Sequence, residues 1–335
     1  MAASPLAFVI AIILVALIFD FLNGFHDAAN SIATIVSTRV LKPYWAVLWA
    51  AFFNFIAFLF FKLNVANTIG TGLINPSTID AYVIFSSLIG AIVWNLLTWF
   101  YGLPSSSSHA LIGGLLGSAL TKTHFAIHTI HLDMLSKVLI SIVLSPLLGM
   151  AAGLFLMFII SRLCFHSPRQ RIERLFRKLQ LVSSALISLG HGGNDAQKTM
   201  GIIAITLFSA GFLGDTFYVP LWVVIVCNLT IALGTFFGGW RIIKTMGMKI
   251  TKLQPNSGFC AETASALTLF LATHMGIPVS TTHTVTGAIM GVGSLYRASA
   301  VRWGVAKNVV WAWIITIPAS AFISGLTFKI IQFVF

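Results

Sequence analysis

Four carboxylates lie inside long apolar segments of the sequence, where an electric charge is costly. They are half of the eight acidic residues in the chain: Asp20, Asp27, Asp195 and Glu262. A charge in a hydrocarbon layer costs at least about 2.5 kcal/mol, so such residues normally face a cavity or a partner and mark an ion or substrate pathway. The alternative is an internal ion pair, such as Asp195 with Lys198 one helical turn later. We predict ion coupling at the four acids and at two residues beside them, Lys198 and His26.

Two hydroxyl-rich motifs stand before glycine-containing apolar segments. They are Pro104-Ser-Ser-Ser-Ser-His109 and Pro278-Val-Ser-Thr-Thr-His283. Hydroxyls cap helix N-termini, and such an end presents free N–H donors and a positive partial charge that suit a tetrahedral oxyanion. The alternative is plain capping, in which the hydroxyls satisfy only their own helix. Because the motif occurs twice beside paired acids, we predict anion binding by its polar side chains: Ser106, Ser107, Ser108, His109, Ser280, Thr281, Thr282 and His283.

Carboxylates beside an anion site repel the anion unless a cation or a proton is bound with it. That is the logic of symport, and Lys198 could supply a fixed positive charge of this kind. His109 and His283 could donate to the anion or carry a proton near neutral pH. The histidines near the acids and the motifs show no HxxH or HxxxH spacing, and the three cysteines form no CxxC pair. We therefore predict no metal site, no disulfide framework and no resident cofactor.

The composition shows which elements must position these residues. Of the 335 residues, 58% are hydrophobic and only 8% are charged, and the mean hydropathy is +0.95. Soluble domains carry about 25% charged residues, so an ordinary globular enzyme, a disordered chain and a nucleic-acid binder are excluded. Ten apolar segments fit as membrane crossings, and some are short or interrupted by polar clusters, which marks discontinuous helices. We predict an all-α polytopic membrane protein with about ten crossings, some of them discontinuous or re-entrant.

An internal repeat relates the two halves of the chain. Gly24-Phe-His-Asp-Ala28 matches Gly192-Gly-Asn-Asp-Ala196, and the two hydroxyl motifs match at a similar offset. Five crossings in each half, an odd number, would insert the second copy from the opposite side, which gives the inverted-topology repeats of many secondary transporters. A duplicated channel or a structural membrane protein is the alternative. The predicted division is a first membrane repeat at 1–162, a basic cytoplasmic linker at 163–181 and a second membrane repeat at 182–335.

Basic residues set the predicted orientation. If the N-terminus is outside, fifteen of the 20 Lys and Arg residues fall in cytoplasmic loops, as the positive-inside rule requires. We predict a multi-pass protein of the cell membrane, or of the inner membrane in a Gram-negative bacterium, with both termini outside. The expected partners include the lipid bilayer and exclude nucleic acid, and a homodimer is compatible with the sequence.

The motifs resemble those of the inorganic phosphate transporter (PiT) family. The family's duplicated signature, Gly-Ala-Asn-Asp-Val-Ala-Asn, is similar to residues 24–30 and 192–198, and its Pro-x-Ser-Thr-(Ser/Thr)-His motif is similar to residues 104–109 and 278–283. The resemblance implies an α-helical transporter that carries inorganic phosphate into the cell, with phosphate contacts from the Ser/Thr turns and ion coupling at the Asp/Asn signatures. Asn30 and Asn194 of these signatures join the predicted phosphate ligands.

Two departures from the family signature bear on the coupling ion. His26 and Lys198 stand where sodium-coupled members have Asn, and an ammonium at Lys198 would compete with a sodium ion. These features resemble the bacterial low-affinity, proton-coupled branch, which is thought to accept metal-phosphate complexes. The expected function is therefore import of inorganic phosphate by symport, with protons as the coupling ion and, in the metal-phosphate case, a divalent metal carried along.

Three other functions are the alternatives to proton-coupled phosphate import. The first is sodium-coupled phosphate symport, and the second is transport of another tetrahedral oxyanion such as sulfate, which the same donors could bind. The third and most remote is an intramembrane hydrolase, for which the sequence contains no GxSxG or HExxH motif. The chain is therefore expected to be a transporter and not an enzyme.

Overall fold

The computed structural model describes residues 6–71, 73–75, 78–277, 279–295 and 297–334. Apart from an isolated bridge between Ile74 and Ile130, the regular secondary structure of these residues is helical. The first half contains α1 (Leu6–Ser37), α2 (Pro43–Ile56), η1 (Ala57–Leu59), α3 (Asn64–Thr71), α4 (Ala81–Tyr101), α5 (Ser107–Lys122), η3 (Ile127–Thr129) and α6 (Leu132–Leu163). The second half contains α7 (Arg169–Ser209), α8 (Leu221–Phe237), α9 (Trp240–Lys244), the π-helical η4 (Thr245–Lys249), α10 (Pro255–His274), α11 (Thr281–Ser294), η5 (Ala298–Ala300) and α12 (Trp303–Val334).

Four helices, α1, α4, α6 and α12, are each long and apolar enough to cross a membrane. Two bent pairs could form two further spans: α2 and η1 with α3, bent by 81°, and α8 with α9 and η4, bent by 61°. Large hydrophobic side chains point outward, as when lipid is the solvent; Phe322 of α12, for example, is 73% exposed. Together with α5, α7, α10 and α11, these elements account for the ten predicted apolar segments. The all-α polytopic class is confirmed.

A glycine and two serines cap helix ends near the middle of the molecule. Helix α4 ends at Gly102, whose φ of 65° lies in the left-handed region that glycine adopts without strain. Helices α5 and α11 are capped by the residues that precede them, Ser106 and Ser280. The side chains of these serines accept hydrogen bonds from the backbone N–H groups of His109 and His283, each at 3.2 Å. Each hydroxyl motif therefore starts a new helix inside the bundle and points that helix's N-terminus inward.

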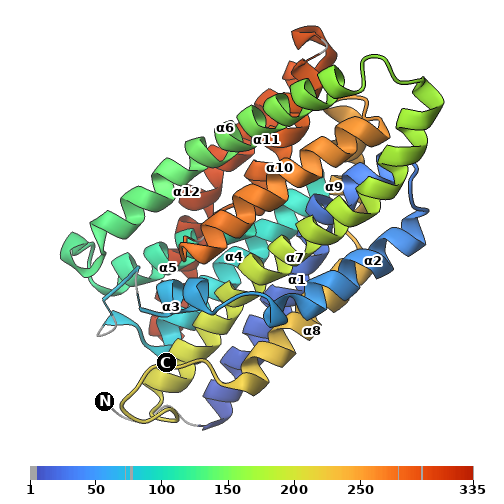
Figure 1. The fold of residues 1–335 in the computed structure, drawn as a ribbon. Helices are drawn as coiled ribbons and strands as arrows, with labels where there is room; N and C mark the ends of the chain where they lie inside the picture. Colours follow the sequence, from blue (N-terminus) through green and yellow to red (C-terminus); the bar gives the residue numbers. More distant parts are fainter. Residues whose placement is uncertain (1–5, 72, 76–77, 278, 296, 335) are drawn as a thin grey trace.

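The two halves place equivalent elements in the same order. Each contains a long helix, a bent pair, a helix, a short hydroxyl-capped helix and a final long helix with an internal proline, Pro146 in α6 and Pro318 in α12. Helices α1 and α7 run in opposite directions (Figure 1): Asp20 of α1 contacts Thr199, whereas Thr38, the residue directly after α1, contacts the earlier Gln180 of α7. An inverted-topology repeat is expected to have this arrangement.

Close glycine contacts hold each short helix against the other half. A Cβ atom on Gly117 of α5 would lie 2.0 Å from the carbonyl oxygen of Ala321 in α12, and a Cβ atom on Gly291 of α11 would lie 2.2 Å from the carbonyl oxygen of Met150 in α6. Only glycine permits backbones to approach this closely. Because Gly117 and Gly291 are equivalent in the repeat, the packing is reciprocal, and it fixes the N-termini of α5 and α11 relative to each other.

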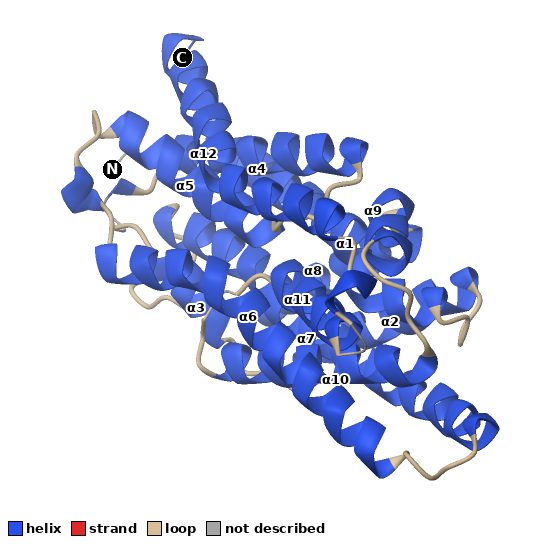
Figure 2. Cartoon of the chain, turned by 90° about the horizontal axis from the view of Figure 1, so that it is seen from above, coloured by secondary structure: helices blue, strands red, loops and turns tan. Residues whose placement is uncertain are grey.

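The start of α1 and the end of α12 lie at one end of the bundle, and the connection between α6 and α7 lies at the other end (Figure 1). Only residues 164–168 separate these two helices, so most of the predicted linker at 163–181 is the first part of α7. Helix continues there because the basic segment contains no Gly or Pro after Pro168, and Phe176 anchors it by being buried. Viewed from above, α1, α7 and α11 lie near the middle, between α4 and α10 (Figure 2).

Candidate functional site

The hydroxyl motifs meet the paired acids where the N-termini of α5 and α11 approach the middle of α1 and α7. Ser107 donates a hydrogen bond to Asp27 Oδ2 at 3.2 Å, and Thr281 donates to Asp195 Oδ2 at 3.0 Å. Thr282 crosses between the halves and donates to Asp27 Oδ1 at 3.4 Å. Motifs that are far apart in the sequence and belong to different halves therefore form one site.

Asn30 and His26 flank Asp27 on α1. The Asn30 amide donates to the two threonine hydroxyls of the second motif at 3.0 and 3.1 Å, and its Oδ1 has no hydrogen-bond partner. His26 Nδ1 lies 2.6 Å from Asp27 Oδ1, and His26 Nε2 lies 3.2 Å from the hydroxyl oxygen of Thr98 in α4. Asp27 is 3% exposed, so the acid of the first half is enclosed by neutral donors and one imidazole.

Lys198 places a fixed positive charge in the site. Its ammonium group donates to Asp195, to the hydroxyl of Ser108 and to the carbonyl oxygen of Val279, the last at 3.2 Å. Lys198 is 1% exposed and Asp195 is fully buried. Breaking a buried ion pair by removing one partner typically costs about 3–5 kcal/mol. Lys198 therefore neutralises the acid of the second half and links it to the hydroxyl motif of the first half.

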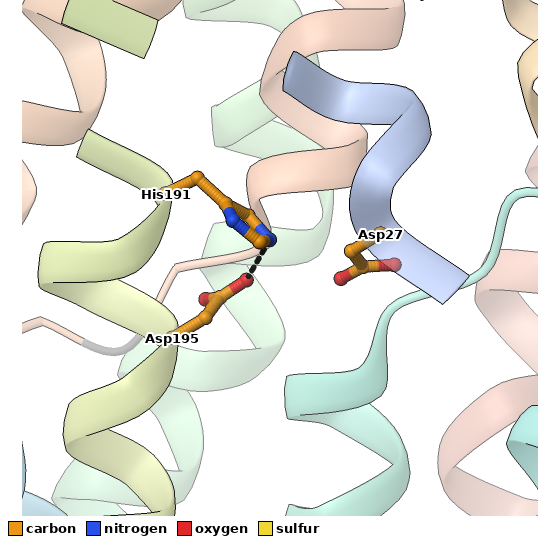
Figure 3. A group of neighbouring side chains, drawn as sticks. All are labelled: Asp27, His191 and Asp195. Atoms are coloured by element: carbon orange, nitrogen blue, oxygen red, sulfur yellow. Dashed lines mark ion pairs between the residues drawn. The ribbon is translucent and has the colours of Figure 1, made fainter. Parts of the chain in front are cut away.

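Asp27, His191 and Asp195 offer three ligand atoms that lie within 4.8 Å of one another. Figure 3 shows their side chains converging on the space between α1 and α7, with His191 Nε2 3.2 Å from Asp195 Oδ2. Two carboxylates and an imidazole form a donor set that could hold a divalent cation, whereas sodium would depend on the carboxylate oxygens. The sequence contains no metal-binding motif that predicts this group, because its members come from two helices.

Glu262 of α10 lies in a separate polar cluster. Its carboxylate accepts hydrogen bonds from Thr34 and Ser183, both at 2.5 Å, and from the Gln180 amide at 3.0 Å. Gln180 accepts in turn from Thr38 at 2.9 Å. Glu262 therefore has no hydrogen bond to the central site, although Thr34 is only seven residues beyond Asp27 on α1.

Two further predicted residues also lie outside the central cluster. Asp20 accepts a hydrogen bond from Thr199 at 2.8 Å, two turns before Asp27 on α1. Asn194 donates to Thr273 of α10 at 3.0 Å. Successive helical residues are rotated by about 100°, so Asn194 turns away from the face that carries Asp195.

His109 and His283 meet each other from the two short helices. Their ring centroids are 4.9 Å apart in an edge-to-face arrangement, and His283 stacks on Trp313 of α12 at 4.1 Å. Both imidazoles are fully buried, and among the described residues no hydrogen bond joins either ring to the acids or hydroxyls of the central site. The pair therefore packs the two short helices together, beside the site.

The capping alternative holds for the N-cap hydroxyl of each motif, Ser106 and Ser280. Ser106 and Ser280 accept from the backbone N–H groups of their own helices, as described above, and donate no hydrogen bond to the acids. The next two hydroxyls of each motif contact the charged groups instead. The structure thus divides the six predicted hydroxyls into two caps and four that face the site: Ser107, Ser108, Thr281 and Thr282.

Several residues of the site and its surroundings carry no motif that sequence reasoning could use. Thr98 contacts His26, and Asn54 Oδ1 lies 3.2 Å from His191 Nδ1. Thr34, Gln180 and Ser183 enclose Glu262. The available signal is the presence of single polar residues in apolar segments, which is weak because hydroxyls and amides also occur in ordinary helix contacts.

The fold and the buried charged site are those of a multi-pass membrane transporter. A family model described as the phosphate transporter family matches residues 23–324, and the chain belongs to this family.

Two curated relatives and one solved structure extend the comparison. A "probable low-affinity inorganic phosphate transporter" of Rhizobium meliloti (strain 1021) is 62% identical over 326 residues, which are 97% of this chain and 96% of the relative. A protein of the same description from Bacillus subtilis (strain 168) is 42% identical over 328 residues, with 97% and 98% coverage. A solved structure described as "the sodium-dependent phosphate transporter" matches with a TM-score of 0.89 at 25% identity, over 98% of this chain and 100% of that one.

These comparisons confirm the family resemblance that the duplicated motifs predicted. The protein is a phosphate transporter and not an enzyme, so the intramembrane hydrolase is excluded as the function. The roles of the individual site residues stay predictions, which the geometry above makes specific.

Proposed function

We propose that this protein imports inorganic phosphate by symport with protons, through a site built from two inverted-topology repeats. The observation that carries the proposal is the position of Lys198, whose ammonium donates to both Asp195 and Ser108. Because this positive charge belongs to the protein itself, Asp195 does not need a transported sodium ion to balance it. Coupling then requires a different carrier of positive charge, and the proton is the smallest.

The charge balance of the site supports coupled transport. Asp27 and Asp195 bring two negative charges near the hydroxyl motifs, and Lys198 brings one positive charge. Adding phosphate, an anion, to this buried site leaves negative charge uncompensated, which is costly away from water. A proton or cation that enters with phosphate offsets that cost, whereas phosphate alone is opposed by it.

The hydrogen-bond donors of the site also suit phosphate. Ser107, Thr281 and Thr282 donate to carboxylates in this state, and the N-termini of α5 and α11 add free N–H groups and positive partial charge. When positive charge neutralises the carboxylates, the hydroxyls are free to donate to phosphate oxygens. This exchange of partners would link phosphate binding to the bound proton.

The test is uptake of radiolabelled phosphate into proteoliposomes under separately imposed gradients. An inward proton gradient should drive accumulation above the equilibrium level, a protonophore should abolish it, and replacing sodium by choline should have no effect. Uptake that requires sodium and ignores the proton gradient would overturn the proposal.

A second candidate is cotransport of a metal cation with phosphate, favoured by the convergence of Asp27, His191 and Asp195 (Figure 3). The same vesicles distinguish it. If the cation travels with phosphate, chelation of external Mg²⁺ should reduce uptake and labelled divalent metal should enter in proportion to phosphate. If protons alone couple transport, neither effect should occur.

We also propose that the protein lies in the cell membrane with both termini outside. The ends of the chain lie at one end of the bundle, and the basic connection between α6 and α7 lies at the other (Figure 1). The positive-inside rule assigns that basic end to the cytoplasm. An epitope tag at either terminus should therefore be accessible on intact cells or spheroplasts.

A further inference from the structure

A stripe of buried polar residues follows one face of α1 through the bundle. Its members recur every three or four residues, which places them on one side of a helix, and each is at most 7% exposed: Asp20, Asn23, Asp27, Asn30, Thr34 and Thr38. The antiparallel α7 lies against this stripe, with Thr199 beside Asp20 and Gln180 beside Thr38. The stripe therefore connects the central site with polar groups nearer both ends of the bundle.

Asp20 differs from the other acids of this region in its partners. Asp195 has Lys198 and Asp27 has His26, whereas Glu262 accepts from three neutral donors. Within the part of the chain that the structure describes, Asp20 has one hydrogen bond, from Thr199 to Oδ1, and Oδ2 has none.

The groups that face Asp20 offer it no positive charge. The titratable side chains near it are Asp195 of α7 and the buried thiol of Cys227 in α8. An ionised carboxylate that is buried without a cation costs several kcal/mol. Asp20 is therefore favoured as the neutral acid in this arrangement, and it can lose its proton when the surroundings change.

The position of Asp20 relates it to the transport path. It precedes Asp27 by seven residues, which places it about 10 Å from the central site along α1, toward the end where the chain termini lie. Asn23 lies between the two acids on the same stripe, and its Oδ1 has no hydrogen-bond partner.

We propose that Asp20 is the group that takes up the coupling proton on the side of the chain termini. The proposal rests on proton symport, as argued above, and adds the residue that carries the proton. A proton from water on that side binds one carboxylate oxygen of Asp20, which neutralises it. The proton then passes to hydrogenphosphate in the central site, which becomes dihydrogenphosphate, and Asp20 returns to the carboxylate. One proton thus enters with each phosphate, and it leaves with dihydrogenphosphate on the other side.

The decisive experiment compares accumulation with exchange in Asp20→Asn. The amide keeps an oxygen for the Thr199 hydrogen bond but cannot cycle a proton. Accumulation driven by a proton gradient should fall at least about tenfold, as expected when a positioned proton-transfer group is lost. Exchange of external for internal phosphate at equal pH, which needs no net proton release, should stay within about twofold of wild type.

Three further variants sharpen the test. Asp20→Glu keeps a carboxyl group and should retain part of the driven accumulation. Thr199→Val removes the one hydrogen-bond donor that Asp20 has among the described residues, and it should shift the pH profile of uptake while exchange continues. Asp215→Asn, the same chemical change at an exposed acid in the loop after α7, should behave as wild type.

Each outcome is decisive. Driven accumulation in Asp20→Asn that equals wild type would overturn the role of Asp20 and leave proton symport intact. Loss of exchange together with accumulation would show that Asp20 is a structural or binding residue, which also overturns the proposal. Proton-independent uptake by the wild-type protein would overturn both this inference and the proposed function.

Discussion

Asp27 and Asp195 occupy equivalent places in the two halves, yet their neighbourhoods differ. Each accepts a hydrogen bond from a hydroxyl motif, so the repeat provides two similar sets of hydrogen-bond donors for an anion. Their charge partners are different: Asp27 contacts His26, which is charged only when it is protonated, and Asp195 contacts Lys198. The symmetric part of the site suits phosphate, whereas the asymmetric part determines which cation can travel with it.

Removing either acid should have the largest effect on phosphate uptake, and the stability of the two variants should distinguish the two halves of the site. We expect Asp27→Asn and Asp195→Asn each to abolish net uptake. Only Asp195→Asn leaves a buried lysine unpaired, which should lower the free energy of unfolding by about 3–5 kcal/mol. Thermal unfolding in detergent measures this difference, and Asp195→Asn combined with Lys198→Met, which removes both charges, should regain stability but not uptake. Near-normal uptake by either single variant would remove that acid from the mechanism.

Replacing Lys198 should have the next largest effect, because it makes the second half resemble the sodium-type signature. Lys198→Asn removes the ammonium that Asp195 and Ser108 both contact. We expect phosphate uptake to fall by about tenfold or more, since removing one partner of a buried ion pair leaves the charge of Asp195 uncompensated at a cost of about 3–5 kcal/mol. Part of the remaining uptake should depend on sodium. His26→Asn, which restores the family signature at the other position that departs from it, should lower uptake less and confer no sodium dependence. Equal effects of the two changes would show that the halves do not differ in their coupling roles.

Substitutions in the two hydroxyl motifs test the part of the site that is similar in both halves. Replacing Ser107 and Ser108 with Ala, or Thr281 and Thr282 with Ala, removes two polar contacts near charged groups. Hydrogen bonds to charged groups are worth about 1.5–3 kcal/mol each, so each double substitution should weaken phosphate binding by on the order of tenfold or more. Equilibrium binding of labelled phosphate measures both variants. Unchanged affinity in both would mean that these hydroxyls serve only their own helices.

Sequence reasoning found the site where a motif recurs and missed contacts that arise from folding. The duplicated signatures and hydroxyl motifs identified Asp27, Asp195 and the short helices, because a repeated polar pattern in an apolar segment is rarely accidental. The cluster of Asp27, His191 and Asp195 depends on the packing of α1 against α7, which no linear spacing reveals. Asn194 was predicted beside phosphate, but the helical rotation of one residue turns it toward Thr273 instead.

The N-cap hydroxyl of each motif gives the smallest expected effect and the most selective test. Ser106 and Ser280 each accept a backbone hydrogen bond at the start of a helix, and loss of such a cap costs about 1 kcal/mol of stability. Ser106→Ala and Ser280→Ala should therefore lower the unfolding temperature slightly, and by similar amounts, while phosphate affinity stays within about twofold of wild type. Ser106→Thr, which can still cap the helix, is the control and should lose less stability than Ser106→Ala. If either alanine variant weakens phosphate binding as much as the double substitutions do, the N-cap hydroxyl contacts the anion when phosphate is bound. The division between caps and ligands would then hold only for the state described here.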